Sequence, residues 1–216
     1  MPPPYAAIFS GAEAALESHR GYDIGALGVA HRMASRLARP IIFSTVTRLL
    51  IDLNRSLDHP DLFSQYALRL HDEDRTRVID ALYTPYRESV SRVIESAITA
   101  GHRVLHVGVH SCTDELDGAR RDLDISFLFD PSRLSELAIC ERWRAQLLNA
   151  VGDIRSPFNE PYLGTDDGLT TTLRSHFPVA SYAGIEIEVR QGMIPGVAEQ
   201  QTVGELLAST SCSIHA

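Results

Sequence analysis

A histidine that follows an apolar run is the first candidate for chemistry in this sequence. The segment VLHVGVHSCT, residues 104–113, has the apolar character of a buried strand, and His110 stands near its end, before small hydroxyl and thiol side chains. A histidine at a strand end is often a hydrogen-bonded structural group, and histidine is also the commonest metal ligand in proteins. His110 is therefore a candidate ligand, and its role depends on what the fold places beside it.

Two glutamates near the end of the chain share one face of a predicted strand. In YAGIEIEVRQ, Glu186 and Glu188 are two residues apart, which puts their side chains on one face about 6.6 Å from each other. Ile185, Ile187 and Val189 occupy the opposite face. If helices cover both faces, the carboxylates are buried, which costs several kcal/mol unless they are paired or functional. The alternative is a solvated edge strand with an arginine as partner.

Two further polar groups stand close to predicted element boundaries. In SHRGYDIGA, His19 and Asp23 precede a helix, so Asp23 is either an N-cap or, together with His110, part of a zinc site. Zinc accepts nitrogen and oxygen ligands and can leave one position open for water. Asn54 and Arg55 can hold a substrate carboxylate by bidentate hydrogen bonds, or form an ordinary surface ion pair.

The elements that must position these residues favour one α/β domain over residues 1–216. Helices are predicted at residues 23–39, at 74–100 with Pro85 as a kink or break, at 132–150, and in LTTTLRSHF and TVGELLAST. Strands are predicted in PIIFST, TRLLIDLNRS, RVLHVGVH, DLDISFLFD and YAGIEIEVRQ. Such alternation is typical of a mostly parallel sheet, whose active crevice lies at the carboxyl ends of the strands. The candidate residues collect at those ends.

The composition excludes several functions. The net charge is −8 and no basic run exceeds two residues, which argues against nucleic-acid and membrane partners. The chain has no lysine, so Schiff-base and Walker-type chemistry are excluded. Cys112, Cys140 and Cys212 are far apart without a CxxC pair, which suits a reducing cytoplasm. No signal peptide is evident, and no apolar run approaches the roughly 18 residues of a membrane span. We expect a cytoplasmic protein of undetermined oligomeric state.

Taken in order, the motifs resemble the N-formylglutamate amidohydrolase (N-formylglutamate deformylase) family. HSCT, IDLNR and EIEVRQ are jointly specific for it, and the resemblance covers about residues 4–191. It implies a three-layer α/β fold with a mostly parallel mixed sheet flanked by helices, similar to the zinc carboxypeptidases. The segments that carry it are SHRGYDIGALGVAHRMASRLARP, TRLLIDLNRS, YTPYRESV, VLHVGVHSCTDELDGARRDLDISFLFDPSR, NEPYLGTDDGLTTTLR and YAGIEIEVRQ.

The same resemblance implies a role for each candidate residue. His110 corresponds to the metal-binding histidine that comes later in the family's sequence, and Asp23 corresponds to the acidic metal ligand. His19 is a second candidate ligand. The resemblance implies one zinc ion per chain. Glu188 corresponds to the catalytic base, with Glu186 assisting. The clamp for the substrate carboxylate is implied at four positions: Asn54, Arg55, Arg48 and Arg121.

The reaction implied is hydrolysis of an N-acyl amino acid such as N-formylglutamate. Glu188 would deprotonate a zinc-bound water, which attacks the formyl or other small acyl carbonyl. Family members carry an upstream strand ending in a Glu-His-Gly-Gly-Asn-like motif with the first metal-binding histidine. The sequence opens at MPPPYAAIFSG, so the resemblance implies an N-terminally truncated chain with an incomplete metal site. The alternatives are a peptidase or cell-wall amidase on the same scaffold, and an inactive binding protein or fragment.

Overall fold

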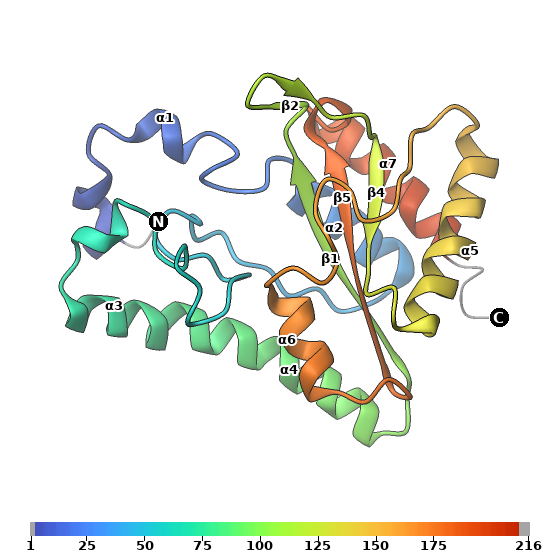
Figure 1. Ribbon diagram of the computed structural model, residues 1–216, viewed down its shortest axis with the longest axis horizontal. Helices are drawn as coiled ribbons and strands as arrows, with labels where there is room; N and C mark the ends of the chain where they lie inside the picture. Colours follow the sequence, from blue (N-terminus) through green and yellow to red (C-terminus); the bar gives the residue numbers. More distant parts are fainter. Residues whose placement is uncertain (1–2, 212–216) are drawn as a thin grey trace.

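Three strands form the central sheet of the computed structural model, which describes residues 3–211 (Figure 1). β5 (Tyr182–Arg190) lies in the middle, parallel to β1 (Val104–Cys112) and antiparallel to β4 (Ile125–Leu128). The fold is thus α/β with a mixed sheet. The predicted mixed sheet is confirmed, with β1 parallel and β4 antiparallel to β5. A small hairpin that was not predicted, β2 (Glu115–Leu116) and β3 (Ala119–Arg120), projects beyond β1.

One face of the sheet is apolar and packs against three helices. These are α2 (Ala26–Leu37), α5 (Leu134–Val151) and α7 (Val197–Ser211) (Figure 1). The three helices confirm the helical predictions in these regions, and α7 is longer than TVGELLAST. Side chains from all three helices and from β4 and β5 form the main core, which includes Val29, Met33, Ile125, Phe127, Cys140, Trp143, Leu147, Ile185, Ile187, Val189, Val203 and Leu207.

The opposite face of the sheet is covered in part by two other helices. α4 (Thr84–Thr99) and α6 (Leu169–His176) contribute to a smaller cluster with Tyr182 of β5, so helices flank the sheet on both sides. α3 (Asp72–Val78) leads into α4 through a π-helical segment, η3 (Ile79–Tyr83). The wide turn directly precedes Pro85, which has no N–H to donate within a helix. The predicted disturbance at Pro85 therefore takes the form of a π-helical turn.

The two strands predicted in PIIFST and TRLLIDLNRS are wrong. Residues 40–56 form coil and turns, held by local bonds such as Leu50 N–H to Thr47 O at 3.0 Å. Their apolar residues are nevertheless buried, because Leu49, Leu50 and Ile51 pack in a separate cluster with Phe9. The short helices of this region are η1 (Pro3–Phe9), α1 (Glu13–Leu16) and η2 (Ala67–Arg69), and η4 (Gln191–Met193) follows β5.

No helix within residues 3–211 combines the length and the apolar character needed to cross a membrane. Cys112 and Cys140 are free and buried, and Cys212 lies outside the described residues.

Candidate active site

The face of the sheet opposite the main core carries the histidines and glutamates. In the parallel register His110 of β1 lies beside Glu188 of β5, and Gly108 lies beside Glu186. Alternate residues of a strand share a face, so both carboxylates are on the face that bears His110. Ile185, Ile187 and Val189 point the other way and are completely buried. The face assignment is confirmed. β5 is central in the sheet, so the alternative of a solvated edge strand is wrong.

Asp23 contacts His110 directly, although the two are far apart in sequence. His110 Nδ1 lies 2.7 Å from Asp23 Oδ2, and Ser111 Oγ donates to the carbonyl of Ile24 at 2.8 Å, which fixes this segment against β1. Asp23 is not the N-cap of α2. Gly25 occupies that position, with φ of 81°, in the left-handed region that favours glycine. The carboxylate of Asp23 is therefore free to orient the imidazole of His110.

This contact decides the protonation state of His110. Burial lowers the pKa of the imidazole, but the hydrogen bond and charge of Asp23 outweigh burial and raise the pKa to about 10. Glu186 and Glu188 act in the same direction. His110 is therefore an imidazolium at neutral pH, with Nδ1 directed to Asp23 and Nε2 left for the site.

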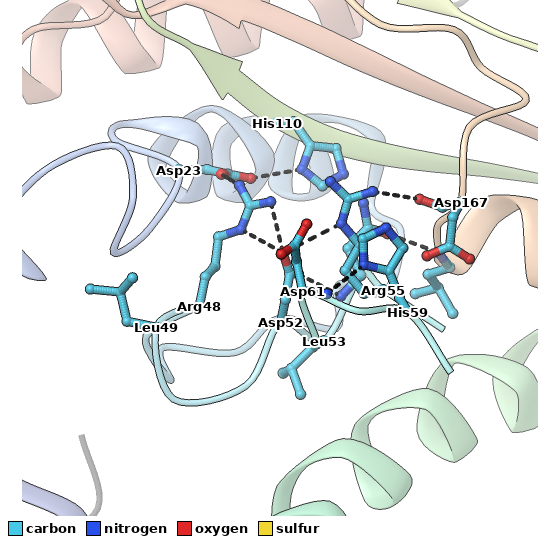
Figure 2. Close-up of polar contacts among 12 residues, drawn as sticks. Asp23, Arg48, Leu49, Asp52, Leu53, Arg55, His59, Asp61, His110 and Asp167 are labelled. Atoms are coloured by element: carbon cyan, nitrogen blue, oxygen red, sulfur yellow. Dashed lines mark hydrogen bonds and ion pairs between the residues drawn. The ribbon is translucent and has the colours of Figure 1, made fainter. Parts of the chain in front are cut away.

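A chain of alternating charges extends from His110 toward the loop of residues 52–56 (Figure 2). Asp23 Oδ1 accepts from Arg48 at 2.9 Å, and Arg48 also donates to Asp52 Oδ2 at 2.9 and 3.1 Å. Arg55 Nε lies 4.0 Å from the same Asp52 oxygen. The guanidinium of Arg48 thus forms ion pairs with two carboxylates of the same chain.

Asn54 and Arg55, the predicted carboxylate clamp, form hydrogen bonds to other parts of the protein. Asn54 Oδ1 accepts from the backbone N–H of Leu169 at 2.8 Å, which satisfies an amide at the start of α6. Arg55 donates to the carbonyl of Asp167 at 3.3 Å. Both contacts connect this loop to the segment before α6, and they give each residue a role in the fold besides the predicted one.

Glu188 is the carboxyl group of the site whose pKa is raised. Its side chain is buried, with 6% of the residue exposed, and Oε2 has no hydrogen-bond partner among the described residues. Burial raises its pKa to about 7, with Asp23 and Glu186 contributing in the same direction and His110 opposing them. A carboxyl group with a pKa near the working pH has the proton affinity expected of a general base.

Glu186 and His110 lie on either side of a space left by a glycine. A Cβ added at Gly108 would lie 3.2 Å from Glu186 Cγ and 3.4 Å from His110 Nε2. The missing side chain therefore leaves the Nε2 of His110 and the half-buried Glu186 facing a common region above β1. Gly108 was not identified from the sequence. Its position two residues before His110 could have indicated that it lies on the same face of the strand.

His106 is a second residue that sequence reasoning missed. It shares the face of His110, and its Nδ1 is hydrogen-bonded to the Tyr182 hydroxyl at 3.0 Å. Burial lowers its pKa to about 4, so this imidazole is neutral at pH 7. Its spacing of four residues from His110 could have indicated this position, because residues four apart in a strand lie on the same face.

The three residues expected to bind zinc do not form a ligand set in this structure. Both oxygens of Asp23 are bonded, one to Arg48 and one to His110. His19 is exposed, and no hydrogen bond or ion pair connects it with Asp23 or His110. Within residues 3–211 no three His, Cys, Asp or Glu side chains are arranged to hold a metal ion. Of this trio, only the Nε2 of His110 remains available to a ligand within the site.

Arg121 comes from the segment after β3 and lies beside a tyrosine from another loop. Its NH2 donates to the Tyr162 hydroxyl at 2.9 Å, and its guanidinium carbon lies 5.2 Å from the centre of the Tyr162 ring. Burial raises the pKa of the thiol of Cys112, the last residue of β1, and the Arg121 guanidinium opposes that rise.

Comparison with known proteins connects this arrangement to one family. The family model for N-formylglutamate amidohydrolase matches residues 1–194. The crystal structure of gene product Atu2144 from Agrobacterium tumefaciens is similar, with a TM-score of 0.83 and 26% sequence identity over 100% of this chain and 87% of that chain. No curated protein matches the sequence.

Proposed function

Since the chain belongs to the N-formylglutamate amidohydrolase family, we propose that it hydrolyses the amide bond of an N-acyl amino acid such as N-formylglutamate. The products would be formate, or another small acid, and the free amino acid. A layout shared with the zinc carboxypeptidases is part of the same proposal. The observation that carries it is Glu188, a buried carboxyl group with an unpartnered oxygen and a pKa raised to about 7.

Glu188 supplies the proton transfers that amide hydrolysis requires. Its carboxylate accepts a proton from water while the water oxygen forms a bond to the acyl carbon. The carbon–nitrogen bond then breaks, and the proton held by Glu188 passes to the leaving nitrogen, which departs as the amine. One water is consumed, and the carboxylate is restored for the next turnover. Glu186 lies on the same face of β5, and its charge helps to raise the pKa of Glu188.

His110 supplies positive charge where the acyl oxygen becomes negative. Its imidazolium directs Nδ1–H to Asp23 and leaves Nε2–H as a donor on the face shared with Glu188. A preorganised donor aimed at a developing oxyanion is among the strongest contributions to catalysis of acyl transfer. Asp23 acts through His110, because its hydrogen bond fixes the orientation of the imidazole and stabilises the charge.

Zinc is the cofactor that the family resemblance implies, and the described residues do not complete a site for it. His110, Asp23 and His19 are not arranged as three ligands, so each step above involves only groups of this chain. The incomplete ligand set favours one alternative function, a protein that binds an N-acyl amino acid without turnover. The same assay separates the two functions.

The test is release of free amino acid from N-formyl-L-glutamate by the purified chain, with and without added zinc. N-acetyl-L-glutamate and other N-acyl amino acids extend the assay to larger acyl groups. We expect turnover that depends on Glu188. Binding of these compounds without hydrolysis, in both the presence and the absence of zinc, would establish the binding protein and overturn the hydrolase.

A further inference from the structure

The central strand β5 extends past the point where its neighbour β4 ends. β4 pairs with β5 only as far as Leu128, which lies opposite Glu186. Within residues 3–211, no strand pairs with Gly184 on that side of β5. Gly184 is buried, and buried backbone N–H and C=O groups need hydrogen-bond partners. The partners of Gly184 on this edge must therefore come from outside the sheet.

A buried ion pair supplies these partners. Glu136 of α5 accepts a hydrogen bond from the N–H of Gly184 at 3.0 Å, and Arg174 of α6 donates one to the carbonyl of Gly184 at 2.6 Å. The two side chains bond each other at 3.1 Å. α5 and α6 pack on opposite faces of the sheet (Figure 1), so their side chains meet beyond the end of β4. Side chains from two layers thus complete the hydrogen bonds of the central strand.

Every side-chain nitrogen and oxygen of this pair has a partner. Glu136 is completely buried, and its Oε2 also accepts from the N–H of Asp130, which follows β4, at 3.1 Å. Arg174 is buried as well and also donates to the carbonyl of Gly164, in the segment before α6. A buried ion pair is weak evidence for stability, and in some proteins such a pair selects one arrangement of the segments that it connects. This pair connects α5, α6, β5 and the segment before α6.

The part of β5 that the pair holds is next to the candidate site. Gly184 precedes Glu186 by two residues and Glu188 by four, so all three share one face of the strand. This face is closely packed at Gly184, because an added Cβ would lie 2.5 Å from the Tyr182 hydroxyl and 2.8 Å from Thr170 Cγ2. A displacement of the backbone at Gly184 would therefore carry both carboxylates with it.

We propose that Glu136 and Arg174 are positioning residues for the hydrolysis: their ion pair completes the edge of β5 and thereby fixes Glu186 and Glu188 relative to β1. The inference rests on the proposed function, and both residues act through the backbone of Gly184. A displacement of about 1 Å at a catalytic group can lower the rate about 100-fold. Because the pair holds the strand that carries the proton acceptor, its loss affects turnover more than substrate binding.

The first experiment compares Glu136→Gln and Arg174→Lys with wild type in the amino-acid release assay, well below the unfolding temperature of each protein. Glutamine has one acceptor oxygen where glutamate has two, so the N–H of Gly184 or that of Asp130 loses its acceptor. We expect kcat for N-formyl-L-glutamate to fall about 10- to 100-fold, while KM changes less than about threefold. Lysine keeps the charge of arginine without its planar fork, so Arg174→Lys should lose less than about tenfold. A kcat of Glu136→Gln equal to that of wild type would overturn the proposal.

The matched control is Leu147→Ala. Leu147 is completely buried on the same helix, α5, and belongs to the main core. This variant should unfold at a lower urea concentration than wild type and keep kcat within about threefold. If Leu147→Ala and Glu136→Gln lower kcat equally, the pair contributes stability alone and the positioning role is wrong.

Amide hydrogen exchange, measured by NMR, tests the edge of β5 without turnover. The exchange rates of Gly184 and Asp130 are divided by that of Ile187, also on β5, which corrects for a change in global stability. We expect at least one of these ratios to rise tenfold or more in Glu136→Gln and neither to change in Leu147→Ala. This pattern in a protein without hydrolysis would refute the proposed function and with it the role in turnover, while the edge contact would stand. Unchanged ratios in Glu136→Gln would refute the edge contact and the positioning role together.

Discussion

Replacing Glu188 by glutamine should remove activity and increase stability in the same protein. Glutamine has nearly the same shape as glutamate but cannot accept a proton from water. Turnover should therefore fall by about 10²- to 10⁴-fold, the usual contribution of one positioned proton-transfer group. The stability effect has another origin, the cost of holding an ionised carboxylate at a buried position.

The magnitude follows from the pKa of Glu188, which burial raises from 4.5 to about 7. Because the folded pKa is above the unfolded one, the folded protein binds more protons between pH 4.5 and pH 7, and wild type loses stability as the pH rises through that window. Above pH 7 the full cost is present, on the order of 3 kcal/mol. Glu188→Gln lacks this cost, so its advantage should be small near pH 4.5 and largest at pH 8.

Urea unfolding of wild type and Glu188→Gln at pH 4.5, 6 and 8 measures the difference, and the amino-acid release assay measures turnover at pH 7. Glu186→Gln is the matched control, since Glu186 lies on the same face of β5 and is only partly buried. It should lose less activity than Glu188→Gln. Two results would refute the reasoning: a variant no more stable at pH 8 than wild type, or an active Glu188→Gln beside an inactive Glu186→Gln.

Three further substitutions test two contacts described above and one ion pair at the end of β5, where Asp124 bonds Arg155 and Arg190. Asp23→Asn should lower the free energy of unfolding at pH 7 by about 1.5–3 kcal/mol, because His110 loses a charged hydrogen bond; an unchanged urea midpoint would contradict this. Asn54→Ala should cost about 1 kcal/mol in thermal unfolding, because the N–H of Leu169 loses its acceptor, and a higher KM at unchanged stability would restore Asn54 to the substrate clamp. Asp124→Asn should destabilise the protein at pH 7. Hydrogen bonds from arginine hold the pKa of Asp124 below 3.8 against the effect of burial, so the difference from wild type should shrink as the pH falls below 3.8, as urea unfolding at pH 7, 4 and 3 would show.

Local periodicity in the sequence was sufficient to predict the strands of the sheet and the helices that pack on it. The alternation in YAGIEIEVRQ predicted β5 and the separation of its glutamates from its isoleucines, and both are confirmed. The strand ending near His110 and the helix after Asp23 are confirmed as well. Period-two and helical patterns arise from the burial of one face, so they are present in the sequence wherever an element has one apolar side.

The same reasoning was wrong where apolar residues are buried without regular structure. Leu49, Leu50 and Ile51 read as a strand because they are consecutive and apolar. In the structure they fill a cluster beneath turns, with local backbone hydrogen bonds in place of a ladder. A short apolar run records burial but not the backbone conformation that achieves it.

The relations between distant residues were decided only by the tertiary structure. The parallel register of β1 and β5 sets His110 beside Glu188, and the fold of the segment before α2 brings Asp23 to His110 across 87 residues of chain. Arg48 and Asn54 have the residue types of a carboxylate clamp, and the fold gives both of them partners within the protein. Residue type determines which bonds a side chain can form. Which bond it does form depends on the groups that packing places within about 3 Å of it, and those groups come from segments whose distance in sequence carries no local signal.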